Sequence, residues 1–325
     1  MNAGMRTSEL TARLMSVGFG ALLSFFLFSA SFVVPLPGLL LSLLAPFPII
    51  FSRFRYGFGA STAVVAITAV LLFAGLGDVR LALVYVAQCG LIALLLSEFL
   101  LRNFSASRSI ALTTAAAVVA CAVAVLALAL VTAQDFYQLH AAVIAEFRSN
   151  MSQPLLAMYE KQSGITPDEL VKIKRAMTLL EEAFVRIYPA LVTLGFMFMS
   201  CCNVALIKRF SRQLGLRLDI GLFANYRNPE VMIWFVIIPG FSLLFAVEPI
   251  TIAALNVLVV CGALYFVQGM AVLFSLLSRF PALGALRWIL CLLLMFQPYL
   301  AILITTVGLF DLWGDFRSPR KRENL

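Results

Sequence analysis

The stretch VVPLPGLLLSLLAPFPIIFSRFRYGFGAS, residues 33–61, decides the fold. It carries four prolines in an apolar run that stops at two arginines and a glycine-spaced YGFG. Proline removes a backbone donor and interrupts helices. Pro35 and Pro37 therefore predict a tight turn between two helices, whereas Pro46 and Pro48 predict a second helix that is bent or partly unwound. Such a helix is tolerated in lipid only where protein or a cavity satisfies its freed carbonyls.

The composition of the whole chain indicates a membrane protein. Of its 325 residues, 62% are hydrophobic and 12% are charged, and the mean hydropathy is +1.00. A soluble domain has about one-quarter charged residues. Uncharged runs of about 17–25 residues, the length that crosses a bilayer as a helix, recur along the sequence. We predict an all-α, polytopic transmembrane helix bundle, with the lipid bilayer as its first partner.

Apolar runs predict where the membrane segments lie: 14–34, 38–52, 58–76, 81–101, 109–132, 188–207, 231–247, 250–278 and 286–313. Lysine and arginine gather in alternate connections, which predicts a cytoplasmic N-terminus. An odd number of crossings would leave the basic tail outside, against the charge rule. Either the tail is an exception, or the last segment, which Gln297 and Pro298 interrupt, turns back within the membrane. The sequence leaves both alternatives open.

Two parts are expected within the chain. Residues 1–207 form a six-helix membrane part that includes an extracytoplasmic amphipathic helical loop at 133–187, and residues 208–325 form a C-terminal membrane part with a basic tail. In the loop, Thr166 and Glu169 predict a capping box at a helix start. The helix is interpreted as a connector or, alternatively, as a lid, and Pro189 is expected to start the next span.

Few residues in the predicted spans suit catalysis. Glu98 is the acid singled out there, and Arg102 four residues later predicts a local ion pair. The sequence has no HExxH, GxSxG or P-loop pattern, and its single histidine is His140 in the outside loop. Its six cysteines fall in apolar runs. We therefore expect no enzyme activity, no metal, no cofactor and no nucleic-acid partner.

Neutral polar residues in the spans are the candidate ligand-lining set, because each is costly in lipid and so faces the interior. Each can instead bond a neighbouring helix, and this alternative is open for every member. The candidates are Tyr85, Gln88, Asn203, Asn256 and Gln268. A separate stripe of small residues, Ser16, Gly20 and Ser24, predicts close helix packing.

Residues 14–207 resemble the substrate-binding S components of energy-coupling-factor vitamin transporters. The similarity lies in the striped first helix, the short second helix ending in APFPIIF and the YGFGAS that opens the third. Nearly the whole chain also resembles the YybS-like family of bacterial membrane proteins. That likeness is carried by ANYRNPEVM at 224–232, LYFVQGMAV at 264–272 and GLFDLWGDFR at 308–317. The resemblance implies an S-component-like part followed by about three further hydrophobic helices.

Two functions are expected. The first is the binding or uptake of a small-molecule ligand through the S-component-like bundle. The second is a non-transporting scaffold that binds a membrane or cytoplasmic protein partner, or anionic lipid, through a basic cytoplasmic surface at Lys208, Arg209 and Arg212.

Overall fold

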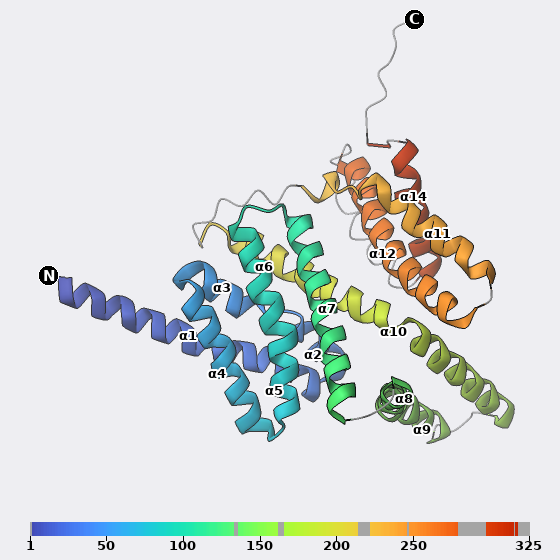
Figure 1. Ribbon diagram of the computed structural model, residues 1–325, viewed down its shortest axis with the longest axis horizontal. Coiled ribbons are helices and arrows are strands. Elements are labelled where there is room, and N and C mark those ends of the chain that lie inside the picture. Colours follow the sequence, from blue (N-terminus) through green and yellow to red (C-terminus); the bar gives the residue numbers. More distant parts are fainter. Residues whose placement is uncertain are drawn as a thin grey trace, which may run out of the picture. The chain divides into compact units, whose positions relative to one another are not determined.

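The computed structural model describes residues 2–132, 136–161, 166–213, 222–245, 247–278, 297–314 and 316–317. All regular elements within these ranges are helices (Figure 1). In this part of the chain, seven helices are long and apolar enough to cross a membrane. Two shorter apolar helical stretches, Glu230–Phe245 and Tyr299–Gly314, accompany them. The prediction of an all-α polytopic bundle is confirmed.

The chain groups into two compact units, each described here by itself. Unit 1 comprises Met1–Leu128 and Thr193–Gly221, and unit 2 comprises Ala129–Val192 and Leu222–Leu325. This division differs from the predicted one, because residues 133–187 group with the C-terminal helices and not with the first six spans. Within unit 2, Asn256 bonds the α10 backbone at Arg186 and Ala190.

Unit 1 contains the first predicted spans. Its elements are α1 (Asn2–Val33), α2 (Pro35–Ser42), α3 (Phe47–Tyr56), α4 (Phe58–Leu76), α5 (Val79–Tyr85), the π-helical turn η1 (Val86–Gly90), α6 (Leu91–Leu101), most of α7 (Ala106–Thr132) and the last part of α10 (Pro167–Phe210). Helix α4 has the predicted bounds because Gly57 and Gly77, both with positive φ, flank it.

The second span is broken, as the prolines predict. Helices α2 and α3 are separated by a turn at residues 43–46. The Asn203 amide donates to the Leu43 carbonyl at 2.9 Å, and the Ser24 hydroxyl donates to the Ala45 carbonyl at 2.7 Å. Protein side chains therefore satisfy the carbonyls that the unwound turn exposes.

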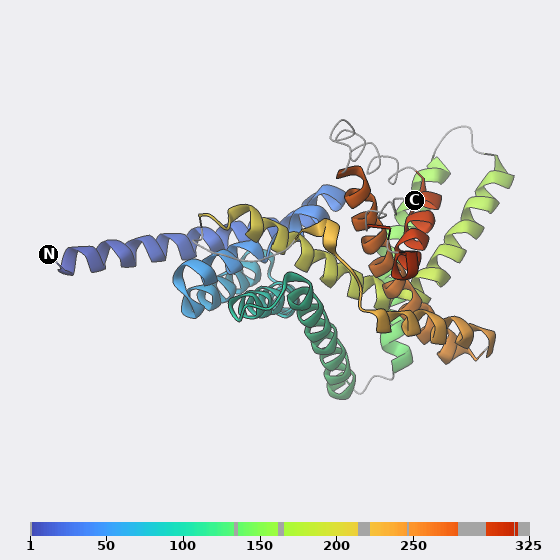
Figure 2. The same cartoon turned by 90° about the horizontal axis from the view of Figure 1, so that it is seen from above.

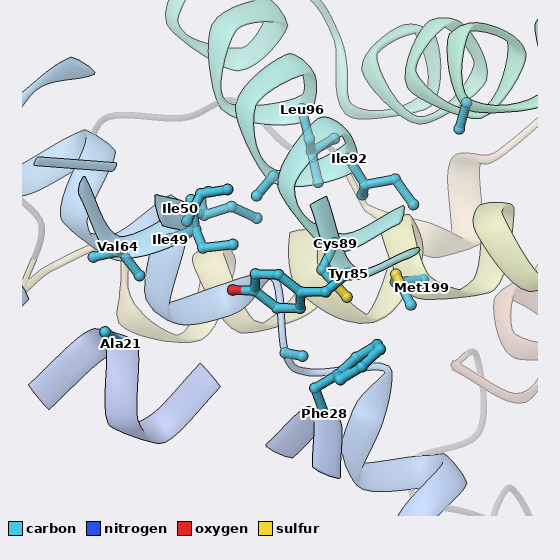
Figure 3. Packing of buried hydrophobic residues seen from close by; sticks show 14 of the residues in the cluster. Ala21, Phe28, Ile49, Ile50, Val64, Tyr85, Cys89, Ile92, Leu96 and Met199 are labelled. Atoms are coloured by element: carbon cyan, nitrogen blue, oxygen red, sulfur yellow. The ribbon is translucent and has the colours of Figure 1, made fainter. Parts of the chain in front are cut away.

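The core of unit 1 surrounds Tyr85, whose side chain is fully buried (Figure 3). Its ring packs edge-on against Phe28 of α1, with centroids 5.3 Å apart. Ile49 of α3 and Ile92 of α6 belong to the same buried cluster. Helices α1, α3, α5 and α6 thus share one apolar core, which buries the face of α1 that carries Ala21.

Unit 2 begins with a helical hairpin. Its elements are α8 (Phe136–Phe147), the π-helical turn η2 (Arg148–Ser152), α9 (Gln153–Lys161) and the first part of α10. Thr166 and Glu169 form the predicted capping box, with bonds of 2.8 and 3.3 Å. Phe147 stacks on Phe184 with centroids 3.9 Å apart. Glu181 accepts from Arg148 at 2.8 Å and raises the pKa of that guanidinium.

The predicted span that begins at Pro189 continues a longer helix and does not start a new one. Helix α10 runs without interruption from Pro167 to Phe210, with Pro189 inside it. A proline in a helix leaves backbone groups unpaired, and these groups need partners from elsewhere. In this helix Asn256 is one such partner.

Among the described residues, unit 2 also contains η3 (Phe223–Asn225), η4 (Glu230–Ile233), α11 (Trp234–Ser242), η5 (Leu243–Phe245), α12 (Glu248–Ser278) and α14 (Pro298–Gly314). The predicted segment 231–247 is thus three short helical pieces. Only the second part of the predicted segment 286–313 lies in the described residues, as α14, which begins at Pro298. The ends of α12 and α14 and the start of α11 lie together at the upper end of unit 2 in Figure 1. Figure 2 shows the same unit from above.

Candidate functional site

The predicted ligand-lining residues are divided between the units. Tyr85, Gln88 and Asn203 belong to unit 1, and Asn256 and Gln268 belong to unit 2. Tyr85 and Ser24 share a hydrogen bond of 2.6 Å between their hydroxyls. Asn203 donates to the Leu43 and Met199 carbonyls. Both side chains therefore bond neighbouring helices or turns. Gln88 is half-buried in the π-helical turn η1, a kind of turn found frequently at functional sites.

Asn256 bonds the backbone of another helix. Its Oδ1 accepts from the Ala190 N–H at 2.8 Å, and its Nδ2 donates to the Arg186 carbonyl at 2.7 Å. In an unbroken α-helix these two backbone groups would bond each other. The Asn256 amide thus stands in the place of one backbone hydrogen bond of α10, next to Pro189.

Gln268 is the predicted residue that leads to a charged site. Its Oε1 accepts from the Asn228 N–H at 2.9 Å, and its Nε2 donates to Asp311 Oδ2 at 3.1 Å. Asn228 also donates to the Leu264 carbonyl and accepts from the Tyr226 hydroxyl at 2.8 Å. A glutamine is suited to this position because its side chain both accepts and donates.

Asp311 is the centre of the cluster and is fully buried. Its Oδ2 accepts from Arg317 Nη2 at 2.9 Å and lies 3.8 Å from Arg227 Nε. Arg317 also donates to the Ala224 carbonyl at 2.9 Å. The other carboxylate oxygen, Oδ1, is buried and has no hydrogen-bond partner in the described part of the chain. A buried carboxylate is strongly disfavoured without such cationic and amide partners.

Sequence reasoning missed two charged members of this cluster, Asp311 and Arg317. Asp311 lies inside the last predicted span, so it is, like Glu98, an acidic residue in an apolar segment. Arg317 belongs to the basic tail by its position in the sequence, but its side chain is only 12% exposed and bonds Asp311. A signal was present in the sequence, since Arg227, Gln268 and Asp311 fall one each in the three stretches quoted for the YybS-like resemblance.

The other predicted residues lie as follows. Gly20 and Ser24 are buried in unit 1 and Ser16 is half-buried, and Gly20 lies against Ser52 and Val64. Lys208 and Arg209 at the end of α10 and Arg212 in the next turn are exposed. Glu98 forms the predicted pair with Arg102 at 2.9 Å, and it also accepts from Arg53 at 2.7 Å. Searching the described residues finds no group of histidine, cysteine and acidic side chains that could hold a metal ion.

Comparison with protein families matches residues 22–312 to the family described as predicted membrane protein (DUF2232). The chain belongs to the DUF2232 family. The match includes Arg227, Gln268 and Asp311 of the cluster, whereas Arg317 lies beyond its last residue in this DUF2232 protein. Among curated proteins and solved structures the same chain finds no match.

Proposed function

We propose that this DUF2232 membrane protein binds or takes up a small polar molecule, and that the Asp311 cluster of unit 2 recognises it. The observation that carries the proposal is a fully buried carboxylate in an apolar helix, with one oxygen that accepts no hydrogen bond from any described group. Ionisable groups at membrane depth are costly and usually mark a ligand, ion or proton path. An unpaired buried acceptor suits a ligand with an N–H or O–H donor.

The location of the cluster supports the same proposal. Residues 226–229 are not helical, and this irregular backbone is held by Gln268 and Leu264 of α12. Irregular backbone in membrane proteins lies where it is buried in protein or lines a cavity, and transporters use such segments for ligands. We retain within this proposal the S-component-like character of the first six spans, the YybS-like relationship, the bacterial inner membrane, the cytoplasmic N-terminus and the absence of enzyme activity.

Native mass spectrometry of the gently purified full-length protein tests the proposal. We expect a bound metabolite on the wild-type protein and on Glu248→Gln, which neutralises an exposed acid at the start of α12. The isosteric Asp311→Asn should lose it, and in a deletion strain Asp311→Asn should fail to restore uptake. Repeated absence of any metabolite, together with normal growth and uptake in the deletion strain, would refute the proposal.

A second function, a scaffold for a cytoplasmic partner, is favoured by one observation. Lys208, Arg209 and Arg212 are all exposed at one end of α10. Crosslinking followed by capture of the tagged protein compares the wild type with a triple glutamine variant at these positions. Loss of one specific partner in the variant, with the bound metabolite unchanged or absent in both, would favour the scaffold.

A further inference from the structure

Five arginines gather at one end of unit 1, and we call this group the arginine patch. Its members are Arg13, Arg53, Arg55, Arg102 and Arg108. They come from α1, from the last turn of α3, from the residue that follows α6 and from the first turn of α7. Because the sequence separates them by up to 95 positions, only the fold brings them together.

Glu98 joins two members of the arginine patch, and the positions of two others follow from neighbouring residues. Glu98 accepts from Arg53 at 2.7 Å and from Arg102 at 2.9 Å, which ties α3 to the end of α6. Gly59, in the first turn of α4, lies so close to Arg13 that a Cβ there would be 3.3 Å from its Nη2. Arg108 follows Arg102 after a turn that is closed by stacking of Phe99 on Phe104.

The arginine patch has an excess of positive charge that reaches solvent. Arg13, Arg55, Arg102 and Arg108 are exposed, whereas Arg53 is largely covered. Glu98 is the acid that the described contacts place among them, and it already bonds Arg53 and Arg102. A concentration of guanidinium groups on one surface attracts anions, and their planar donor sets fit phosphate oxygens.

Exposed apolar side chains border the arginine patch. Phe58 is 57% exposed, and the Arg53 guanidinium lies over its ring. The Arg53 Cζ is 5.0 Å from the centroid of the Phe58 ring. Leu101 and Phe104 are also exposed beside Arg102. Arginines at the ends of apolar helices lie at the membrane interface, where the hydrocarbon core meets the lipid phosphates. This arrangement favours lipid over an acidic protein as the partner.

We propose that the arginine patch binds the phosphates of anionic phospholipid headgroups. The interaction is separate from the ligand proposed for unit 2. Arg55 and Arg108 supply charge without the Glu98 contacts, so they are the residues to change. Each arginine near such a surface changes lipid affinity by about fivefold.

Native mass spectrometry of the full-length protein, titrated with phosphatidylglycerol or with phosphatidylcholine of the same acyl chains, measures the preference. We expect Arg55→Gln/Arg108→Gln to reduce the preference for phosphatidylglycerol by about tenfold or more. Arg55→Lys/Arg108→Lys should retain most of it. Arg80→Gln, an exposed arginine at the start of α5, is the matched control and should leave it unchanged.

Three outcomes would overturn the proposal. An equal preference for phosphatidylglycerol in the wild type and in the double glutamine variant would remove the arginine patch as its source. Displacement of the lipid by an equal concentration of inorganic phosphate would assign the patch to a free anion. Binding of an acidic peptide without any lipid preference would assign it to a protein. Thermal unfolding of each variant is the control, because it shows whether the variant is folded before its lipid preference is compared with that of the wild type.

Discussion

The Asn256 amide replaces one backbone hydrogen bond of α10, next to Pro189. Asn256→Leu leaves the Ala190 N–H and the Arg186 carbonyl without these partners. We expect a loss of about 1–2 kcal/mol in the free energy of unfolding, the size found for polar bonds between helices in model membrane peptides. Titration with sodium dodecyl sulfate, followed by tryptophan fluorescence, measures it.

Pro189→Ala supplies the control for this interpretation. Without proline the helix can close its own backbone bonds more easily, so Asn256→Leu should cost less in the Pro189→Ala background. Equal costs in both backgrounds would mean that Asn256 stabilises the protein by a route unrelated to the proline.

The sequence identified polar residues that matter but not what they bind. Asn203 is buried and Asn256 is half-buried, and their partners include backbone groups 160 and 70 positions away. Gln268 is a candidate because it is also polar in an apolar run, but the sequence does not indicate that Asp311 is its partner. Polarity in an apolar run can be read locally, whereas the identity of a partner depends on packing between distant helices.

Helices α12 and α14 cross at two glycines, Gly269 and Gly308. A Cβ on Gly308 would clash with the Tyr265 carbonyl, and one on Gly269 would clash with the Ile304 carbonyl. Gly308→Ala must therefore separate the helices, and we expect a loss of about 1–3 kcal/mol in the free energy of unfolding. Gly262→Ala on the same α12 is the control, because nothing lies within 4 Å of its Cβ position. It should be neutral or stabilising.

The turn between α2 and α3 depends on α1. Ser24→Ala removes the donor to the Ala45 carbonyl and the partner of the Tyr85 hydroxyl, both buried. We expect a loss of about 1–3 kcal/mol in the free energy of unfolding. Ser31→Ala, on the same helix, removes only a bond to the Phe28 carbonyl of its own turn and should change stability by less than about 0.5 kcal/mol. Similar losses for both would show that the turn does not need Ser24.

Individual elements were more predictable than their boundaries inside proline-rich or polar stretches. The α4 helix and the capping box at Thr166 follow from local signals, namely flanking glycines and a Thr-x-x-Glu spacing. Pro189 misled the prediction because a distant side chain compensates for it. The unit boundaries could not be read either, since α10 contributes to both units through contacts that sequence spacing does not reveal.

The contacts of unit 2 show which residues lie beside Arg317, where the basic tail begins. Arg317, three residues after α14, bonds the Ala224 carbonyl, and Phe223 packs against Phe274 near the end of α12. The tail therefore starts beside residues 223–228. Residues 211–229, between α10 and η4, include three arginines and an aspartate and are too polar to cross a bilayer.

We predict from this polarity that the tail and the basic loop after α10 lie on the same side, for which the charge rule predicts the cytoplasm. The alternative with the basic tail outside is disfavoured by this geometry. We predict that topology reporters fused after Arg212 and after Leu325 give the same cytoplasmic signal. A reporter inserted at Asp78, beyond the full-length span α4, should give the opposite one. Opposite signals from Arg212 and Leu325 would mean that the Arg317 contact with Ala224 does not form in the membrane.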